Sequence, residues 1–165
     1  MGPAGDDPVR FDVVPAESDD ARWCLEHYYR ELADRFADGF DPTAALPADA
    51  GAMTPPTGVF VVARVDARLV ACGGVQSVGS GVADLKRMWV ASDARGVGLG
   101  RRLLAELERH AGELEFSTLR LETNRALSEA IALYRSAGYR EGAPHNDEPH
   151  ADHWFSKELP PPARA

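Results

Sequence analysis

The chain has 165 residues, 44% of them hydrophobic and 27% charged, a composition typical of a globular protein about the size of one domain. Its 18 Lys and Arg against 26 Asp and Glu give a formal net charge of −8, so we expect no nucleic-acid binding and no association with anionic membranes. The two cysteines, Cys24 and Cys72, lie far apart in apolar sequence, which argues against a disulfide framework and a paired-cysteine zinc site and predicts buried, inert thiols.

The first part of the chain predicts a strand followed by an amphipathic helix. Residues 9–14 fit a short strand, and Ser18 suits the cap of a helix whose apolar positions recur every three or four residues as far as Phe36. Residues 38–58 hold four prolines and three glycines, which predicts a long loop of the kind that is often functional.

Strands and helices then alternate along the rest of the chain. The expected strands are residues 59–65, 69–75, 82–90, 119–123 and 153–159. Helical periodicity follows Gly100, and a second helix after residue 123 ends at Gly138. This order predicts an α/β (α+β) fold in which helices cover a mixed sheet.

The ends of the chain lack targeting features. Residues 1–8 and 160–165 are expected to be loose tails around a single domain at 9–159. No apolar run approaches the ~18 residues of a membrane span, and the start has no basic or apolar stretch. We therefore expect a cytoplasmic protein.

A glycine-rich loop lies between an expected strand and the first turn of an expected helix. Its residues are Arg95, Gly96, Val97, Gly98, Leu99, Gly100 and Arg101. The free N–H groups and positive dipole of a helix N-terminus attract an anion, and glycines leave those amides open to a phosphate. The spacing matches neither the dinucleotide fingerprint nor the loop of nucleoside triphosphatases. A tight turn without a ligand is the alternative.

Two motifs together resemble the GNAT superfamily of N-acetyltransferases, in a branch of single-domain bacterial enzymes. Arg95-x-x-Gly98-x-Gly100, after a strand that ends Met88-Trp89-Val90, is similar to the family's acetyl-CoA signature. Residues 130–139, with Leu133-Tyr134-x-x-x-Gly138-Tyr139, resemble the family's later helix. The resemblance implies a mostly antiparallel twisted sheet of about six to seven strands, with a cleft for acetyl-CoA where two strands splay.

The same resemblance assigns the site residues. The expected cofactor-binding residues are Met88, Trp89, Val90, the loop from Arg95 to Arg101, and Asn124. The backbone of Met88, Trp89 and Val90 would pair with the pantetheine arm as an added strand does, and an amide there would stabilise the developing oxyanion. Many relatives have an asparagine seven residues before the tyrosine, where this chain has Leu127, so Asn124 is the candidate to replace that contact.

Three residues are candidates for proton transfer. An alkylamine with a pKa near ~10.4 must lose a proton before it attacks, and Glu122 or Asp84 is the expected base. Tyr134 is expected to donate a proton to the leaving thiolate. A surface carboxylate and a core tyrosine are the plainer alternatives. Ser128 is expected to cap the helix that carries Tyr134.

The acceptor side is less well defined. Tyr28, Tyr29, Phe36 and Phe40, with Trp154, either form an aromatic pocket for a cation or pack in the core. The acidic residues Glu26, Glu31, Asp34 and Asp38 form either a charged pocket or a solvated helix face. His145, His150 and His153 alternate with Asp147, Glu148 and Asp152, but their spacing matches no zinc signature, so no metal is expected.

Three functions follow from the sequence. The favoured one is transfer of the acetyl group of acetyl-CoA to a primary amine of a small molecule or peptide, directly within a ternary complex. The others are a non-catalytic acyl-CoA sensor and an acyltransferase with another acyl-CoA donor. A monomer and a homodimer are both compatible with the sequence.

Overall fold

The computed structural model describes residues 8–36 and 50–161 of the chain. Its elements are β1 (Val9–Val13), α1 (Asp19–Arg35), the 3-10 turn η1 (Ala50–Met53), β2 (Gly58–Val65), β3 (Arg68–Gly79), β4 (Val82–Val90), the 3-10 turn η2 (Ser92–Ala94), α2 (Leu99–Glu113), β5 (Thr118–Thr123), α3 (Ser128–Ser136), β6 (Arg140–Gly142) and β7 (His153–Glu158). Phe40 and most of the loop expected at 38–58 lie outside the described residues.

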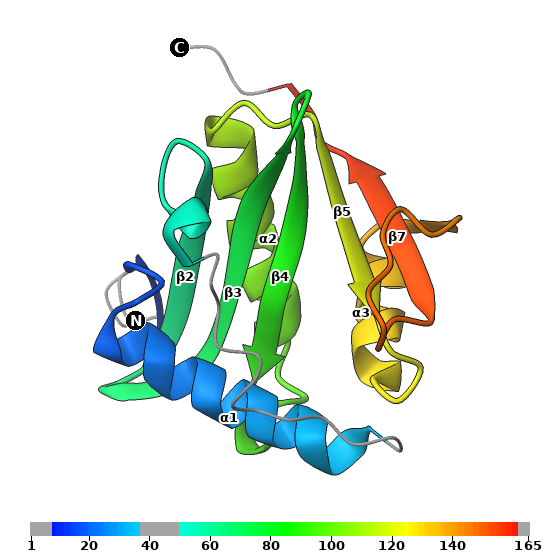
Figure 1. Ribbon diagram of the computed structural model, residues 1–165. Coiled ribbons are helices and arrows are strands. Elements are labelled where there is room, and N and C mark those ends of the chain that lie inside the picture. Colours follow the sequence, from blue (N-terminus) through cyan, green and yellow to red (C-terminus); the bar gives the residue numbers. More distant parts are fainter. Residues whose placement is uncertain (1–7, 37–49, 162–165) are drawn as a thin grey trace, which may run out of the picture.

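The strands form one mixed sheet of seven, in the order β1-β2-β3-β4-β5-β7-β6. Neighbours are antiparallel except β4 and β5, which run parallel. Figure 1 shows α1 across one face of the sheet and α2 behind the other face. The prediction of a mostly antiparallel sheet flanked by helices is therefore confirmed.

Each face of the sheet buries its own apolar cluster. On the α2 face, Leu103, Leu104 and Leu107 are each at most 1% exposed. On the α1 face, Cys24 and Cys72 lie in a second cluster, and both are buried free thiols, as the sequence predicts. Burying a leucine side chain fully contributes about 1.5–3 kcal/mol, so these two layers hold the helices against the sheet.

Helix α1 begins where its sequence predicts. Ser18 has an extended backbone, and its Oγ accepts a hydrogen bond from the N–H of Ala21 at 3.2 Å. Asp19 and Asp20 in the first turn and Arg35 in the last turn complement the helix dipole. The cap and the dipole fix the start of α1, and its apolar stripe fixes which face meets the sheet.

Strands β4 and β5 pair over only a short length. Their parallel pairing joins Val82 to Thr118 and continues to Asp84 and Arg120. Beyond that point the two strands diverge, which Figure 1 shows clearly. The second half of β4 therefore presents a backbone edge that β5 does not cover.

The other edge of β4 carries a bulge. Cys72 pairs with Trp89 and Gly74 pairs with Lys86, so two residues of β4 oppose the single Gly73 of β3. One of the two, Arg87, has a φ of 56°, which is unusual for a residue with a side chain. Such a bulge redirects the side chains on either side of it.

Two expectations from the sequence are corrected. Helix α3 begins with Ser128 as its first helical residue, and its cap position is Leu127, without a side-chain cap. Asn124 organises this turn instead. Its side-chain Oδ1 accepts a hydrogen bond from the N–H of Ala126 at 2.8 Å, and its backbone carbonyl accepts one from the N–H of Leu127 at 2.9 Å. The sequence analysis also missed β6, three exposed residues that pair with β7.

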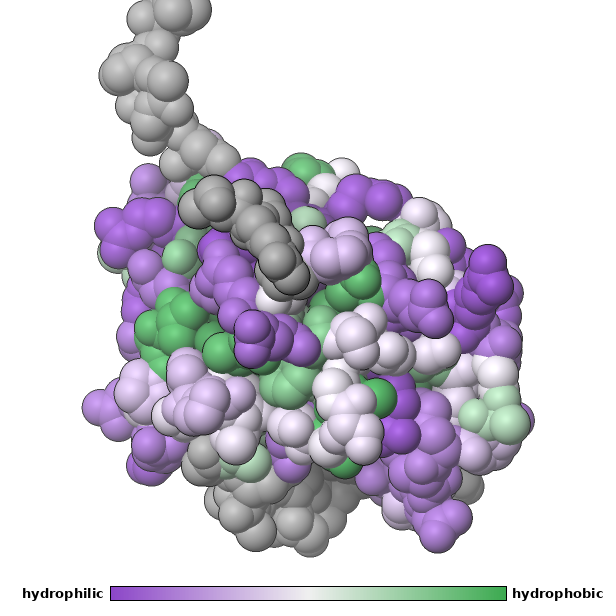
Figure 2. Space-filling model, turned by 90° about the horizontal axis from the view of Figure 1, so that it is seen from above, coloured by the Kyte–Doolittle hydropathy of each residue, from purple (hydrophilic) through white to green (hydrophobic). Residues whose placement is uncertain are grey.

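The end of the molecule with the β3–β4 turn is mostly polar, and its apolar residues form small separate patches (Figure 2). In the part of the chain that the structure describes, no helix combines the length and apolar character needed to cross a membrane. Among the large hydrophobic residues that the structure describes, Val97 in the glycine loop is the most exposed, at 78%.

Candidate active site

A cavity of about 330 Å³ lies where β4 and β5 separate. Ten residues that the sequence assigned to the site line it: Met88, Trp89, Val90, Arg95, Gly96, Gly98, Leu99, Gly100, Arg101 and Tyr134. They come from the uncovered half of β4, the glycine loop and α3, and α1 closes the remaining side. We call this cavity the donor cleft.

The glycine loop opens the N-terminus of α2 to the donor cleft. Gly96 and Gly98 have φ values of 86° and 79°, and an added Cβ at either would meet no atom within 4 Å. Gly98 is the cap residue, and its carbonyl accepts the first helical bond from Arg102 at 3.1 Å. No acidic side chain lies in the first turn, so the N–H groups of Leu99, Gly100 and Arg101 are available to an anion.

Gly100 has a different role from the other two glycines. A Cβ there would lie 3.3 Å from Cδ2 of Leu133 in α3. Its missing side chain therefore lets α2 approach α3 closely, and both helices border the donor cleft.

The two arginines of the loop are held by protein groups. Arg95 donates from Nε to the carbonyl of Val90 at 3.0 Å and from Nη2 to Glu31 at 2.5 and 2.7 Å. Arg101 donates to Oγ of Ser136 at 2.7 Å. The Val90 carbonyl thus already accepts a hydrogen bond, and Arg95 would have to give up its bonds to Glu31 in order to turn those donors to a phosphate.

The Arg95–Glu31 pair belongs to a network across the mouth of the donor cleft. Arg35 of α1 binds Glu129 of α3, and the Arg35 guanidinium lowers the pKa of Glu129 to about 2. Because that pKa is depressed, the pair contributes its full stabilisation at pH values above the ordinary pKa of a glutamate. This contribution is lost as the pH falls toward about 2. The network joins α1, α3 and the glycine loop.

Tyr134 packs in the core and also reaches the donor cleft. Its ring is buried against Tyr139 and Phe155, while its hydroxyl borders the donor cleft and donates to Sδ of Met88 at 3.9 Å. Burial, with a smaller contribution from Glu122, raises the pKa of Tyr134 above its ordinary value of 10.0. The hydroxyl therefore keeps its proton at neutral pH.

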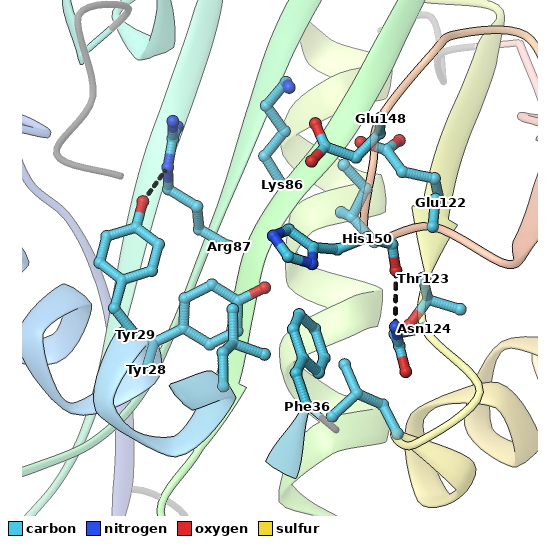
Figure 3. Close-up of a pocket in the computed structure, with 14 residues that line it drawn as sticks. Tyr28, Tyr29, Phe36, Lys86, Arg87, Glu122, Thr123, Asn124, Glu148 and His150 are labelled. Atoms are coloured by element: carbon cyan, nitrogen blue, oxygen red, sulfur yellow. Dashed lines mark hydrogen bonds between the residues drawn. The ribbon is translucent and has the colours of Figure 1, made fainter. Parts of the chain in front are cut away.

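A second cavity, of about 500 Å³, adjoins the donor cleft. Tyr28, Leu32 and Leu127 line both. The second cavity also contains Tyr29, Phe36, Lys86, Arg87, Glu122, Glu148 and His150, several of which Figure 3 shows. We call it the acceptor cavity. The two cavities are therefore neighbours that share these three residues as a common wall.

Glu122 lines the acceptor cavity and Asp84 does not. Oε2 of Glu122 is buried without a hydrogen-bond partner among the described residues. Asp84 is 5% exposed, accepts from Nε of Arg120 at 2.9 Å, and is absent from the described lining of both cavities. Arg120 and Glu122 share a face of β5, as alternation predicts, but β4 and β5 separate between them. Of the two candidate carboxylates, Glu122 is therefore the one that borders a cavity.

Two of the predicted cofactor-binding residues, Asn124 and Val97, do not line the donor cleft. Asn124 lines the acceptor cavity, and its side chain is engaged by Ala126 and by the carbonyl of His150, to which its Nδ2 donates at 2.7 Å. Val97 points to solvent. The position seven residues before Tyr134 is Leu127, which contributes an apolar surface to both cavities.

The other acceptor-side residues are dispersed. His150 stacks on Phe36 with ring centroids 5.2 Å apart, whereas His153 pairs with Glu141 at 2.6 Å and Trp154 donates to Asn146 at 2.9 Å. Across residues 8–36 and 50–161, no group of three potential metal ligands converges. Glu31 lines the donor cleft, and Glu26 is exposed.

Sequence analysis did not foresee that Lys86 and Arg87 both line the acceptor cavity. Strict alternation would place consecutive residues of β4 on opposite faces. Both line the acceptor cavity because Arg87 sits at the bulge with its positive φ. The sequence contains no signal for this bulge, since a left-handed arginine cannot be foreseen from composition.

Comparison with known proteins identifies the family and supports the fold. The sequence model of the acetyltransferase (GNAT) family matches residues 20–139. An uncharacterised N-acetyltransferase of Schizosaccharomyces pombe is 29% identical over 139 residues, which cover 82% of this chain and 84% of that protein. An IAA acetyltransferase of Azospirillum brasilense is 40% identical over 86 residues, 52% of this chain and 56% of that protein. The crystal structure of a GNAT-family acetyltransferase from Staphylococcus aureus superposes with a TM-score of 0.75 at 16% identity, covering 92% of this chain and 100% of that one.

Proposed function

This chain belongs to the GNAT acetyltransferase family and is an acyltransferase, and from that premise we propose that it moves the acetyl group of acetyl-CoA to a primary amine of a small molecule or peptide. The observation that carries the proposal is the junction of the donor cleft and the acceptor cavity along Tyr28, Leu32 and Leu127. Direct transfer needs both reactants in contact, and two adjoining cavities provide that contact.

The donor cleft fits acetyl-CoA in two respects. Its glycine loop exposes the first N–H groups of α2, which suit a diphosphate. The uncovered edge of β4 at Met88 and Trp89 suits the amide-bearing pantetheine arm, which would pair with it as an extra strand. A β4 amide would stabilise the negative charge that develops on the thioester oxygen.

The protonated acceptor must lose two protons in forming an amide. Glu122, directly or through water, would accept the first and expose the lone pair of the nitrogen. The C–N bond then forms, the C–S bond breaks, and the nitrogen loses its second proton. Tyr134 would donate one proton to the departing thiolate and recover it from solvent, so that one proton is released overall.

Acetyl-CoA is expected to stabilise the protein against heat. Selective binding to the native state at a hundredfold excess over Kd contributes about 2.7 kcal/mol, which appears as a higher Tm. Differential scanning fluorimetry with acetyl-CoA, succinyl-CoA and free CoA, combined with thiol release over a panel of amines, measures donor binding and transfer. Absence of any shift with all three compounds would contradict the proposal. A larger shift and faster turnover with succinyl-CoA would instead assign another donor, and binding of acetyl-CoA without turnover of any amine would indicate a sensor.

The Glu122→Gln variant is expected to lower kcat/KM for the amine about tenfold near neutral pH, since water replaces the base only in part. The defect should shrink as the pH approaches the amine pKa near ~10.4, because a neutral amine needs no base. Initial rates from pH 6 to 10 measure this dependence.

Asp84→Asn serves as the matched carboxylate control. It leaves Arg120 without its ion pair, which is expected to lower the free energy of unfolding by about 1–3 kcal/mol without changing the shape of the pH profile. A pH-dependent defect in Asp84→Asn, together with a normal profile in Glu122→Gln, would reverse the assignment of the base.

A further inference from the structure

The acceptor cavity carries charges of both signs on separate elements. The cations are Lys86 and Arg87, consecutive residues of β4, and the anions are Glu122 of β5 and Glu148 of the segment before β7. In Figure 3 the two carboxylates lie on the right of the cavity and Arg87 on the left, with Lys86 between them in this view. The four formal charges sum to zero.

Lys86 is the cation of this set that the fold leaves uncommitted. The structure gives its ammonium no hydrogen bond or ion pair among the described residues, although its side chain is half-buried at the cavity. Arg87 instead donates from Nε to the hydroxyl of Tyr29 at 2.7 Å and from Nη1 to Sδ of Met53 at 3.4 Å. A half-buried cation at a cavity without a protein partner is suited to a ligand anion.

The opposite charge is also available. Oε2 of Glu122 is buried and has no hydrogen-bond partner in the described part of the chain, and Glu148 lines the same cavity. Leu32, Phe36 and Leu127 contribute an apolar and aromatic part of the remaining wall, which also contains the polar residues Thr123, Asn124 and His150. A simple alkylamine would use the carboxylates and the apolar wall but would leave Lys86 unused.

We propose that the acceptor is a zwitterion: an amino acid, or a compound built like one, with an apolar side chain, whose carboxylate is bound by Lys86 while its amine faces Glu122. The inference rests on the proposed acetyl transfer and names its substrate class. A zwitterion has no net charge and keeps this neutral set of four charges neutral, whereas an amine that carries a phosphate dianion would add net negative charge. The bulge at Arg87 makes this recognition possible because it turns Lys86 and Arg87 toward one cavity.

The test compares acceptors that differ only at the carboxylate. L-phenylalanine is set against 2-phenylethylamine and phenylalaninamide, and L-leucine against isopentylamine and leucinamide. Thiol release at saturating acetyl-CoA, corrected for the fraction of neutral amine, gives kcat/KM for each. We expect the carboxylate-bearing member of each set to be preferred about ten- to a hundredfold.

Substitutions of Lys86, with Lys157 as the control, test which residue causes the preference for a carboxylate. Lys86→Met is expected to reduce the preference to within about threefold and Lys86→Arg to restore most of it, since a charge-assisted hydrogen bond is lost and then replaced. Lys157→Met removes the same charge from a residue that pairs with Glu108 at 3.0 Å, and it should keep the wild-type preference. Acetyl-CoA affinity, measured by calorimetry, should be unchanged in both Lys86 variants.

Different failures have different meanings. Equal or better turnover of the amines without a carboxylate, an unchanged preference in Lys86→Met, or binding of acetyl-CoA without turnover of any of the six compounds would each overturn the zwitterion assignment. The first two would leave acetyl transfer intact. Failure of acetyl-CoA to bind the wild-type protein would instead remove the proposed function itself, and the inference with it.

Discussion

Tyr134→Phe is expected to lower kcat at least about a hundredfold while acetyl-CoA binding stays near the wild-type value. A positioned general acid contributes about 10²–10⁴ to the rate. The Tyr134 hydroxyl is protonated at neutral pH and borders the donor cleft beside Met88, where it is placed to protonate the thiolate. Phenylalanine preserves the ring that packs on Tyr139 and Phe155 and removes only the oxygen. Single-turnover rates with saturating acetyl-CoA measure the chemical step.

Tyr139→Phe is the control for this experiment. The ring centroids of Tyr134 and Tyr139 lie 5.9 Å apart, but the Tyr139 hydroxyl donates a hydrogen bond to Glu108 at 2.8 Å, on the α2 side of the sheet. Its removal should cost about 1 kcal/mol of stability and leave kcat close to wild type. Equal rates for Tyr134→Phe and wild type would disprove the general-acid role and leave Tyr134 as a core residue. Equal losses in both variants would point to a packing effect.

The second large effect is expected at the glycine loop. Gly98→Val should lower kcat/KM for acetyl-CoA about a hundredfold, equivalent to about 2.7 kcal/mol of donor binding. Gly98 has a φ of 79°, where a β-branched residue costs about 1–2 kcal/mol, and the new side chain would stand at the open N-terminus of α2. Calorimetric titration with acetyl-CoA and thermal unfolding separate the loss of binding from the loss of stability.

Two further substitutions divide backbone strain from obstruction. Asparagine tolerates a positive φ better than valine does, so Gly98→Asn adds a side chain with less strain. Weak binding of acetyl-CoA in both Gly98 variants indicates that the added side chain blocks the anion site. Weak binding in Gly98→Val alone indicates that backbone strain is the cause. Gly112→Ala, in the same helix and with open space around its Cβ position, should leave binding unchanged. Wild-type affinity in Gly98→Val would show that the loop does not bind the donor.

The donor side was predictable in most respects. Local sequence marks the end of β4, the glycines and the start of α2, and ten of the assigned residues line one cleft. The state of the loop arginines was less predictable, because Arg95 reaches Glu31, which is 64 positions away in the chain. A sequence motif identifies the groups that can bind an anion, but it does not say which of them are already paired.

The acceptor side depended on the fold. The sequence analysis offered Glu122 as the first candidate base and Asp84 as the second, and the divergence of β4 and β5 separates them, with Asp84 held by Arg120 in the paired part. Asn124 was expected at the donor, yet it organises the turn before α3. For Asp84 the partner comes from a segment distant in sequence, and for Asn124 the local turn is joined by a bond to the carbonyl of His150, 26 positions away.

By itself the sequence determined the helices, most of the strands, the open helix N-terminus and the family resemblance. These features depend on contacts within one turn or on alternation along one strand, so side-chain periodicity, caps and glycines encode them directly. Only the tertiary structure decided where β4 and β5 separate, that Arg87 turns at a bulge, and that Lys86 and Glu122 share one cavity. These features arise from strand register and packing between remote segments, where the free energy depends on all partners at once and no local pattern records the outcome.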